Sequence, residues 1–264
     1  VWGLRRDPTG LPAQIQPLAA DLADPSSLAV LPEGLEAIAY TAAAGASTEP
    51  AYQAAYVQGL ANLLEALAAR GEQIRRVLFT SSTAVYGQSA GEWVDETSPT
   101  EPAGFSGRIL LEAERVLARG PFPGIAVRLG GIYGPGRTRL LRQVLASEAR
   151  LPAEPAYTNR IHRDDCAGLL AHLLALAEPQ LLYLGVDHDP ADLRDVYLWL
   201  AEQLGSPPPQ AAEPGASATG ARTRAGSKRC SNARLLASGY RFLYPTFREG
   251  YGELIEQEAR GENC

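Results

Sequence analysis

Sulfur-containing residues are scarce in this chain. The 264 residues include no methionine and only three cysteines, Cys166, Cys230 and Cys264. Widely spaced cysteines in odd number argue against a disulfide framework and indicate free thiols in a reducing, cytoplasmic compartment. Because the chain has no methionine, Val1 is not a translation start, and we expect a first segment to be missing from this sequence.

Long apolar runs and an excess of basic charge are also absent. No apolar run approaches the roughly 18–20 residues that a bilayer-spanning helix needs, so we expect no membrane partner. The formal net charge is −6, whereas a protein that binds nucleic acid presents a basic surface. No Cys/His spacing is typical of a metal site. These absences leave a protein that acts on small molecules as the main expectation.

Apolar and charged segments alternate along the chain in the manner of an α/β protein. Residues 1–4, 15–20, 37–41, 77–81, 125–129 and 180–185 read as strands, and residues 49–70, 105–119, 139–148, 164–176 and 191–204 read as helices. We expect Asp164 and Asp165 to cap the helix that they open. Residues 206–226, rich in Pro, Ala, Gly and Ser, read as a loop. The alternation predicts an α/β fold with a doubly wound parallel sheet.

The stretch RVLFTSSTAVYG (residues 76–87) is the centre of this pattern. Its apolar run reads as a strand buried on both faces, as in parallel sheets. Hydroxyl side chains crowd the end of the strand, at Thr80, Ser81, Ser82 and Thr83. Open α/β sheets bind ligands outside the carboxyl ends of their strands, although such hydroxyls also cap turns.

Three motifs in this order resemble the NAD-dependent epimerase/dehydratase family, the extended or atypical short-chain dehydrogenases/reductases. They are RVLFTSSTAVYG, then VRLGGIYGPGR (residues 127–137), then NRIHRDD (residues 159–165). The resemblance implies a Rossmann-type sheet with a small C-terminal substrate lobe. We place the dinucleotide-binding domain at residues 1–136 and the mainly substrate-binding lobe at residues 137–264.

The resemblance also implies a bound nicotinamide dinucleotide. The family's glycine-rich turn, which cradles the pyrophosphate, is absent, and we expect it in the missing first segment. After the first visible strand the chain has Arg5 and Arg6, with no acid before Asp7. An acid there suits the 2′-hydroxyl of NAD, whereas guanidinium groups suit the 2′-phosphate of NADP. We therefore expect NADP, with NAD as the other choice and solvated surface arginines as the plain alternative.

Further cofactor contacts follow from the same resemblance. Asp21 and Leu22 match the adenine contact, and the small residues after the third strand match a turn against the cofactor, although small residues also serve tight packing. The remaining positions lie after the two central strands. The full cofactor set is Arg5, Arg6, Asp21, Leu22, Ala42, Ala43, Ala44, Thr80, Ser81, Gly130, Gly131 and Ile132.

The catalytic pattern of the family is incomplete in this chain. Ser82 matches the Ser or Thr that polarises the substrate oxygen in the family. A Tyr that transfers the proton and a Lys four residues later are expected at the start of the next long helix, where this chain has Phe105 and Ile109. Phenylalanine has no proton to transfer, and isoleucine can neither tune a pKa nor bind a ribose. The usual acid/base pair is missing.

Three explanations stay open. The protein is a catalytically silent dinucleotide binder, such as a redox-responsive regulator. Alternatively it uses a substitute acid, for which Thr83, Tyr86 and Tyr133 are the candidates, or it reduces an acceptor that needs no proton from the protein. An enzyme with Ser82, Thr83 and Tyr86 in its catalytic site is our first interpretation. An interaction scaffold that has lost the cofactor is a third class.

The substrate lobe supplies the remaining candidates. They are Tyr133, Arg137, Asn159, Arg160 and His162. Two arginines favour an anionic substrate, for example a sugar nucleotide, whereas a histidine before a helix is commonly structural. The helices at 49–70 and 105–119 match those that pair in family dimers, so a homodimer is expected unless the sheet uses both apolar faces. We interpret the chain as an NADP-dependent oxidoreductase of this family acting on a small or nucleotide-linked carbonyl or hydroxyl substrate.

Overall fold

A computed structural model describes residues 1–212 and 226–260, and these form two compact units. Unit 1 comprises Val1–Ser81 and Gly104–Ala126, and unit 2 comprises Ser82–Ala103 and Val127–Cys264. Most of the loop expected at 206–226 lies outside the described residues, as does Cys264. The assignment of cofactor binding to residues 1–136 and substrate binding to the rest stays a prediction.

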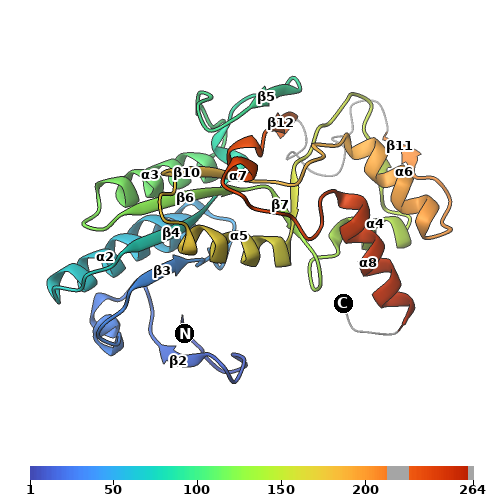
Figure 1. Ribbon diagram of the computed structural model, residues 1–264. Helices are drawn as coiled ribbons and strands as arrows, with labels where there is room; N and C mark the ends of the chain where they lie inside the picture. The colour runs from blue at the N-terminus through green and yellow to red at the C-terminus, as the bar shows by residue number, and fades with distance from the viewer. Residues whose placement is uncertain (213–225, 261–264) are drawn as a thin grey trace. The chain divides into compact units, whose positions relative to one another are not determined.

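Unit 1 has the strand and helix order of a Rossmann half (Figure 1). Its strands are β1 (Trp2–Arg5), β2 (Gln16–Ala19), β3 (Ala37–Tyr40), β4 (Arg76–Ser82, whose last residue begins unit 2) and the first half of β6 (Gly124–Leu129). Its helical segments are η1 (Pro25–Val30), α1 (Glu49–Tyr52), η2 (Gln53–Gln58), α2 (Gly59–Ala69) and α3 (Phe105–Arg119). β1 pairs with β2 and β3 with β4, both in parallel. A four-stranded sheet has the order β10-β6-β4-β3, in which β10 is Leu182–Gly185, and it confirms the expected parallel α/β fold.

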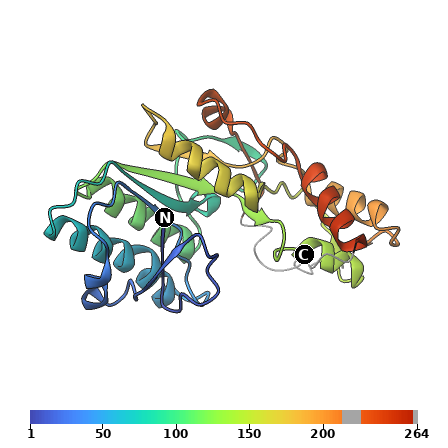
Figure 2. The same ribbon diagram turned by 60° about the horizontal axis from the view of Figure 1, so that its bottom comes forward.

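The helix expected at 49–70 is one continuous helical stretch with a wide π turn in its middle, η2, between α1 and α2. This stretch lies along α3 (Figure 2). Gly59 lies against the side chain of Tyr40, the last residue of β3. A Cβ at this position would lie 2.6 Å from the hydroxyl oxygen of Tyr40 and 3.2 Å from the carbonyl oxygen of Ala54. A side chain at this position would push the Tyr40 hydroxyl aside and crowd the Ala54 carbonyl, so glycine suits it.

Unit 2 is built from shorter pieces. Its strands are β5 (Glu92–Val94), β7 (Gly131–Tyr133), β8 (Arg150–Leu151), β9 (Arg160–His162), β10 (Leu182–Gly185), β11 (Gln210–Ala211) and β12 (Lys228–Cys230), besides the second half of β6. Its helices are η3 (Thr83–Val85), α4 (Arg139–Leu145), α5 (Arg163–Ala175), α6 (Leu193–Gln203), α7 (Ala233–Ala237) and α8 (Phe247–Ala259). β7 pairs with β9, β5 with β12 and β8 with β11, all in parallel.

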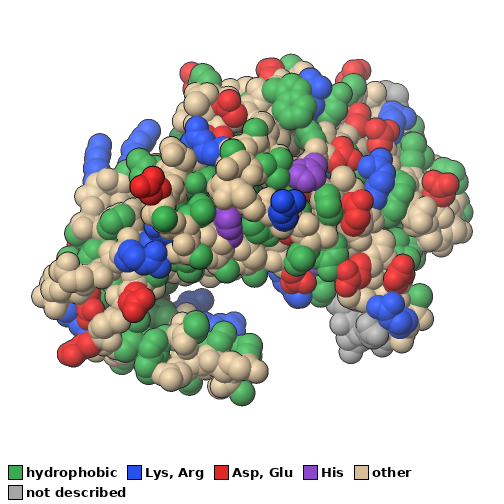
Figure 3. Space-filling model, viewed as in Figure 1, with side chains coloured by type: hydrophobic (Ala, Val, Ile, Leu, Met, Phe, Trp, Pro, Cys, Tyr) green, Lys and Arg blue, Asp and Glu red, His purple; other side chains and the backbone are tan. Residues whose placement is uncertain are grey.

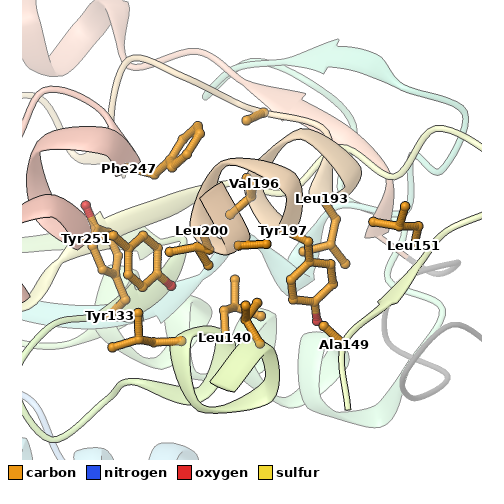
Figure 4. Packing of buried hydrophobic residues seen from close by; sticks show 14 of the residues in the cluster. Tyr133, Leu140, Ala149, Leu151, Leu193, Val196, Tyr197, Leu200, Phe247 and Tyr251 are labelled. Carbon is orange, nitrogen blue, oxygen red and sulfur yellow. The ribbon is translucent and has the colours of Figure 1, made fainter. Parts of the chain in front are cut away.

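The core of unit 2 lies between α4, α6 and α8 (Figure 4). Leu200 and Val196 of α6 are fully buried there. Tyr133 of β7 stacks on Tyr251 of α8 with ring centroids 4.5 Å apart. Large apolar and aromatic side chains from segments far apart in the sequence thus form one core, because none of these short elements could bury its apolar face alone.

The start of α5 differs from the expected cap. The capping residue is His162, whose Nδ1 accepts a hydrogen bond from the backbone N–H of Asp164 at 3.2 Å. Asp164 lies in the first turn of the helix. Asp165 is fully buried, and its carboxylate accepts hydrogen bonds from the Tyr240 hydroxyl and from the backbone N–H of Leu243 at 2.8 Å each. The acid expected to cap the helix therefore anchors the segment that precedes α8.

Acidic, basic and apolar side chains are interspersed on the face seen in Figure 3. No helix among the described residues has the length and apolar character that a membrane span requires. Within the same residues, no group of three or more His, Cys, Asp or Glu side chains could hold a metal ion.

Candidate functional site

The end of β1 presents two basic side chains. Arg5 and Arg6 are both exposed. A guanidinium nitrogen of Arg6 lies 4.0 Å from the position that a Cβ would take at Gly45, in the loop after β3. The next acid, Asp7, accepts hydrogen bonds from the backbone N–H of Thr9 at 3.0 Å and from its hydroxyl at 2.6 Å. These bonds lower the pKa of Asp7. The only acid of this turn is therefore held by its own loop.

The loop after β2 is tied to helix α2. One carboxylate oxygen of Asp21 accepts a hydrogen bond from Ala23 N–H at 3.0 Å. The carbonyl of Leu22 accepts one from the side-chain amide of Asn62 at 2.8 Å. The two residues expected to contact adenine are thus held in place by partners of unit 1.

The small-residue turn after β3 also contacts the long helix. Ala42 and Ala44 are partly buried and Ala43 is exposed. The backbone N–H of Ala44 donates to the hydroxyl of Tyr56, which burial nevertheless gives a raised pKa.

The hydroxyls at the end of β4 have partners within unit 1. Thr80 Oγ1 donates to the carbonyl of Tyr40 at 3.2 Å, which links the ends of β4 and β3. Ser81 Oγ donates to a carboxylate oxygen of Glu114 in α3 at 2.6 Å. Unit 1 therefore gathers all nine of its expected cofactor residues into loops and strand ends that follow β1, β2, β3 and β4.

At the start of α3, packed apolar side chains stand where the family resemblance leads us to expect an acid/base pair. The ring of Phe105, the first residue of α3, meets that of Tyr52 edge to face with centroids 5.4 Å apart. Ile109, one turn later, is 4% exposed. An apolar side chain in each position provides neither a proton donor nor an ammonium group.

In unit 2, Ser82 and Thr83 form the turn after β4. Ser82 caps η3, because its hydroxyl accepts a hydrogen bond from Ala84 N–H at 3.2 Å. Ser82 and Thr83 are both partly buried.

The hydroxyl of Tyr86 has two partners in unit 2. It donates to the carbonyl of Asp95 at 2.7 Å and accepts from the Arg128 guanidinium at 2.8 Å. Burial raises the pKa of Tyr86 to about 12, although the nearby Arg128 acts in the opposite direction. Lys228, the single lysine of the sequence, is buried and its Nζ donates to the carbonyl of Tyr86 at 3.3 Å. The first two contacts hold the ring of Tyr86, and the third holds its backbone.

The glycines after β6 permit a close approach of two backbone segments. A Cβ at Gly130 would lie 3.0 Å from the carbonyl carbon and oxygen of Asn159. Gly131 N–H donates to the same carbonyl at 2.8 Å, and Ile132 continues β7 beside β9. The Asn159 side chain in turn donates to the carbonyl of Lys228 and accepts from Cys230 N–H, at 3.0 and 2.7 Å. Asn159 therefore fastens β12 to this part of unit 2.

The other substrate-lobe candidates differ in exposure. Arg137 is exposed in the turn after β7, whereas Arg160, Tyr133 and His162 are buried. Tyr133 donates to the carbonyl of Thr246 at 3.4 Å, and burial raises its pKa. His162 lies against Tyr133 with ring centroids 5.3 Å apart, and burial lowers its pKa. Of these four side chains, Arg137 is the one open to a ligand.

A model of the NAD dependent epimerase/dehydratase family matches residues 1–157. The chain belongs to this family. An Escherichia coli (strain K12) relative, protein YeeZ, is 35% identical over 158 residues, which are 59% of this chain and 55% of YeeZ. The chain thus spans about half the length of this curated relative. Membership of an NAD-dependent family confirms the expected nicotinamide dinucleotide as the class of cofactor.

Two further relatives cover more of the chain. A solved structure from Methylobacillus flagellatus, described as an NAD-dependent epimerase/dehydratase, is 40% identical in sequence to this chain. The superposition covers 98% of this chain and 89% of that chain, with a TM-score of 0.78. This likeness confirms the Rossmann-type fold. A 3-diazoavenalumate denitrifying reductase from Streptomyces sp is 29% identical over 216 residues, 74% of this chain and 69% of the reductase.

Two buried titratable groups in this epimerase/dehydratase-family chain, Asp187 and Lys228, were not found from the sequence. Asp187 is 2% exposed, and one of its carboxylate oxygens has no hydrogen-bond partner among the described residues. A guanidinium nitrogen of Arg160 is likewise buried without one. Burial raises the pKa of Asp187 to about 8, against the pull of Arg160. A buried acid in a loop has no sequence signature, but the presence of one lysine in the whole chain could have drawn attention to Lys228.

Proposed function

We propose that the protein is an NADP-dependent oxidoreductase that acts on a small carbonyl or hydroxyl substrate, free or linked to a nucleotide. A bound nicotinamide dinucleotide supplies or accepts a hydride. The choice of NADP over NAD rests on the side chains of the turn after β1. Its two arginines are exposed, and its one acid is occupied by Thr9. This arrangement offers guanidinium groups to a 2′-phosphate and no free carboxylate to a ribose 2′-hydroxyl.

The residues of unit 1 that follow β1 to β4 would hold the dinucleotide. Arg5 and Arg6 would bind the 2′-phosphate, and Asp21 and Leu22 would lie at the adenine. Ala42, Ala43, Ala44, Thr80 and Ser81 would line the rest of the cofactor. In unit 2, Gly130, Gly131 and Ile132 are proposed to meet the nicotinamide end.

The substrate roles rest on unit 2. Ser82 would polarise the substrate oxygen, with Thr83 beside it, and Arg137 would attract an anionic group. The other four candidates would support the substrate lobe without binding the substrate directly, because their polar atoms have protein partners or are buried. They are Tyr133, Asn159, Arg160 and His162. We extend the proposal to a homodimer, as the family resemblance implies, in the cytoplasm, as the widely spaced cysteines indicate.

Calorimetric titration of the full-length protein with NADPH and NADH tests the cofactor choice. We expect NADPH to bind more tightly. A charge-assisted hydrogen bond contributes about 1.5–3 kcal/mol, so Arg6→Ala should weaken NADPH binding by roughly 10- to 100-fold and leave NADH binding unchanged. Arg119→Ala, in the last turn of α3, is the matched control. Equal affinity for the two cofactors would refute the role of the arginines, and binding of neither would remove the oxidoreductase proposal.

A second candidate is a catalytically silent, redox-responsive dinucleotide binder. The apolar pair Phe105 and Ile109 favours it, because neither side chain can transfer a proton or hold a ribose. Consumption of NADPH with a panel of aldehydes, ketones and quinones separates the candidates. Turnover that Ser82→Ala abolishes would support the enzyme, whereas tight NADPH binding without turnover of any acceptor would support the silent binder.

A further inference from the structure

Four aromatic side chains of unit 1 form a cluster beside the ends of β3 and β4. The ring centroids of Tyr52 and Tyr56 are 5.2 Å apart, and Tyr52 meets Phe105 at 5.4 Å. Tyr56 meets Phe79 of β4 edge to face at 6.4 Å. The cluster therefore joins the long helix after β3, the strand β4 and the first residue of α3.

This cluster lies on the ligand-binding side of the sheet. The backbone N–H of Ala44, in the loop that leaves β3, donates to the hydroxyl of Tyr56. Thr80 at the end of β4 bonds the carbonyl of Tyr40 at the end of β3. Loops that follow neighbouring parallel strands meet at one edge of the sheet, the edge at which open α/β sheets bind their ligands.

The three tyrosines of unit 1 differ in what their hydroxyls do. The hydroxyl of Tyr40 donates to the carbonyl of Ala55 at 2.5 Å, whereas that of Tyr56 accepts a hydrogen bond from the backbone N–H of Ala44. The hydroxyl of Tyr52 makes no hydrogen bond to any residue that the structure describes, and its side chain is only half-buried. Tyr52 is thus the one tyrosine of unit 1 whose hydroxyl makes no hydrogen bond within the described residues, and its ring is the one that meets Phe105.

We propose that Tyr52 is the catalytic proton donor, and that its hydroxyl replaces the one that Phe105 lacks. The inference rests on the proposed function, because it requires a bound nicotinamide dinucleotide and a carbonyl acceptor. Tyr52 gives its phenolic proton to the acceptor's carbonyl oxygen while the carbonyl carbon receives a hydride from the reduced nicotinamide. The phenolate then takes up one proton from the bulk solvent, to which the half-buried position of Tyr52 gives access. The products are the alcohol, the oxidised cofactor and the neutral tyrosine.

The ring contact between Tyr52 and Phe105 supports the proposal that the Tyr52 hydroxyl replaces the missing one. The resemblance to the family puts a tyrosine hydroxyl at the start of α3, and the edge-to-face contact brings the Tyr52 ring to that residue. Tyr86 and Tyr133, the two tyrosines among the donors considered from the sequence, donate to the carbonyls of Asp95 and Thr246 and are buried. Removing a proton from either would leave a buried carbonyl without its donor.

The first test needs no acceptor. In protein with 13C-labelled tyrosine and saturating NADP+, we expect nuclear Overhauser effects between the Tyr52 ring protons and the H4 proton of the nicotinamide. The Tyr52→Phe variant assigns the Tyr52 signals by their loss. If NADP+ binds by calorimetry and these contacts are absent, the Tyr52 proposal is wrong while the proposed function stands. If NADP+ and NADPH do not bind, the proposed function itself fails and takes this inference with it.

The second test measures turnover with NADPH and an acceptor panel of 4-nitrobenzaldehyde, an aliphatic ketone and an ortho-quinone. General acid catalysis contributes roughly 100- to 10,000-fold, so Tyr52→Phe should lower kcat at least about 100-fold and keep NADPH affinity within about twofold. Tyr157→Phe, a partly buried tyrosine of unit 2, is the control and should keep the kcat of the unmodified protein. If the Tyr52→Phe variant keeps the kcat of the unmodified protein, the proton-donor role is wrong. The role is also wrong if Tyr52 contacts the nicotinamide in the first test but the protein reduces none of the acceptors.

Discussion

Asp187→Asn should make the stability of unit 2 less dependent on pH between about 4 and 8. Burial raises the pKa of the Asp187 carboxyl from 3.8 to about 8 in the folded chain, although Arg160 acts in the opposite direction. Between these two values the folded protein keeps the proton and the unfolded chain loses it. The free energy of unfolding of the unmodified protein therefore falls as pH rises through this window and levels off above about 8. The amide side chain of the variant has no proton to lose in this range, so the variant escapes this fall.

The expected magnitude follows from the width of the window. Each pH unit inside it is worth about 1.4 kcal/mol. Between about pH 5 and pH 8 the unmodified protein should lose up to ~4 kcal/mol relative to Asp187→Asn. This is an upper bound, since Asp189 and Glu249 raise the pKa of Asp187 through their charges and lose that influence when salt is added.

Urea unfolding at four pH values between 5 and 8 measures the difference. A Trp2→Phe background confines the fluorescence signal to unit 2, which holds Trp93 and Trp199. Asp195→Asn is the matched control, because this acid is exposed in the first turn of α6. If the free energy of unfolding changes with pH by the same amount in the unmodified protein and in Asp187→Asn, the reasoning is refuted. That result would mean that Asp187 stays ionised in the folded state.

Two further predictions concern the stability of unit 2. Leu200→Ala, at a fully buried position of α6, should lower the free energy of unfolding by about 2–5 kcal/mol, while Leu198→Ala, 38% exposed on the same helix, should change it by less than ~1 kcal/mol. Urea unfolding measures both, and similar losses would place Leu200 outside the core. Thr246→Ala removes the capping box of α8 with Glu249 and should cost about 0.5–2 kcal/mol by the same assay. Thr246→Ser should recover most of that loss, and an equal loss in both variants would show that the cap contributes little.

The elements with long apolar periodicity could be predicted from the sequence. The bounds of α3 agree with the helix expected at 105–119, because its buried residues recur at helical spacing. β4 is recognisable because its apolar run is buried on both faces. The predicted strands at 125–129 and 180–185 likewise correspond to β6 and β10.

The short strands β5, β8, β11 and β12 of unit 2 could not be predicted. β12 pairs with β5, and β11 with β8, across long separations in sequence. Strands of two or three residues have no readable period, and they form only where another segment supplies the backbone partner. The cap of α5 was wrongly assigned to Asp164 and Asp165 for a similar reason, since the burial of Asp165 against Tyr240 depends on the segment before α8.

The sequence by itself determined the family, the parallel α/β fold and the apolar residues at positions 105 and 109, because motifs and periodicity are local properties of the chain. Only the tertiary structure decided which hydroxyls are already engaged. Tyr86 is bonded to Asp95 and Arg128, whereas Tyr52 meets Phe105 and its hydroxyl is uncommitted among the described residues. The partner of a polar group depends on which distant segment folds against it, and residue spacing along the chain does not carry that information.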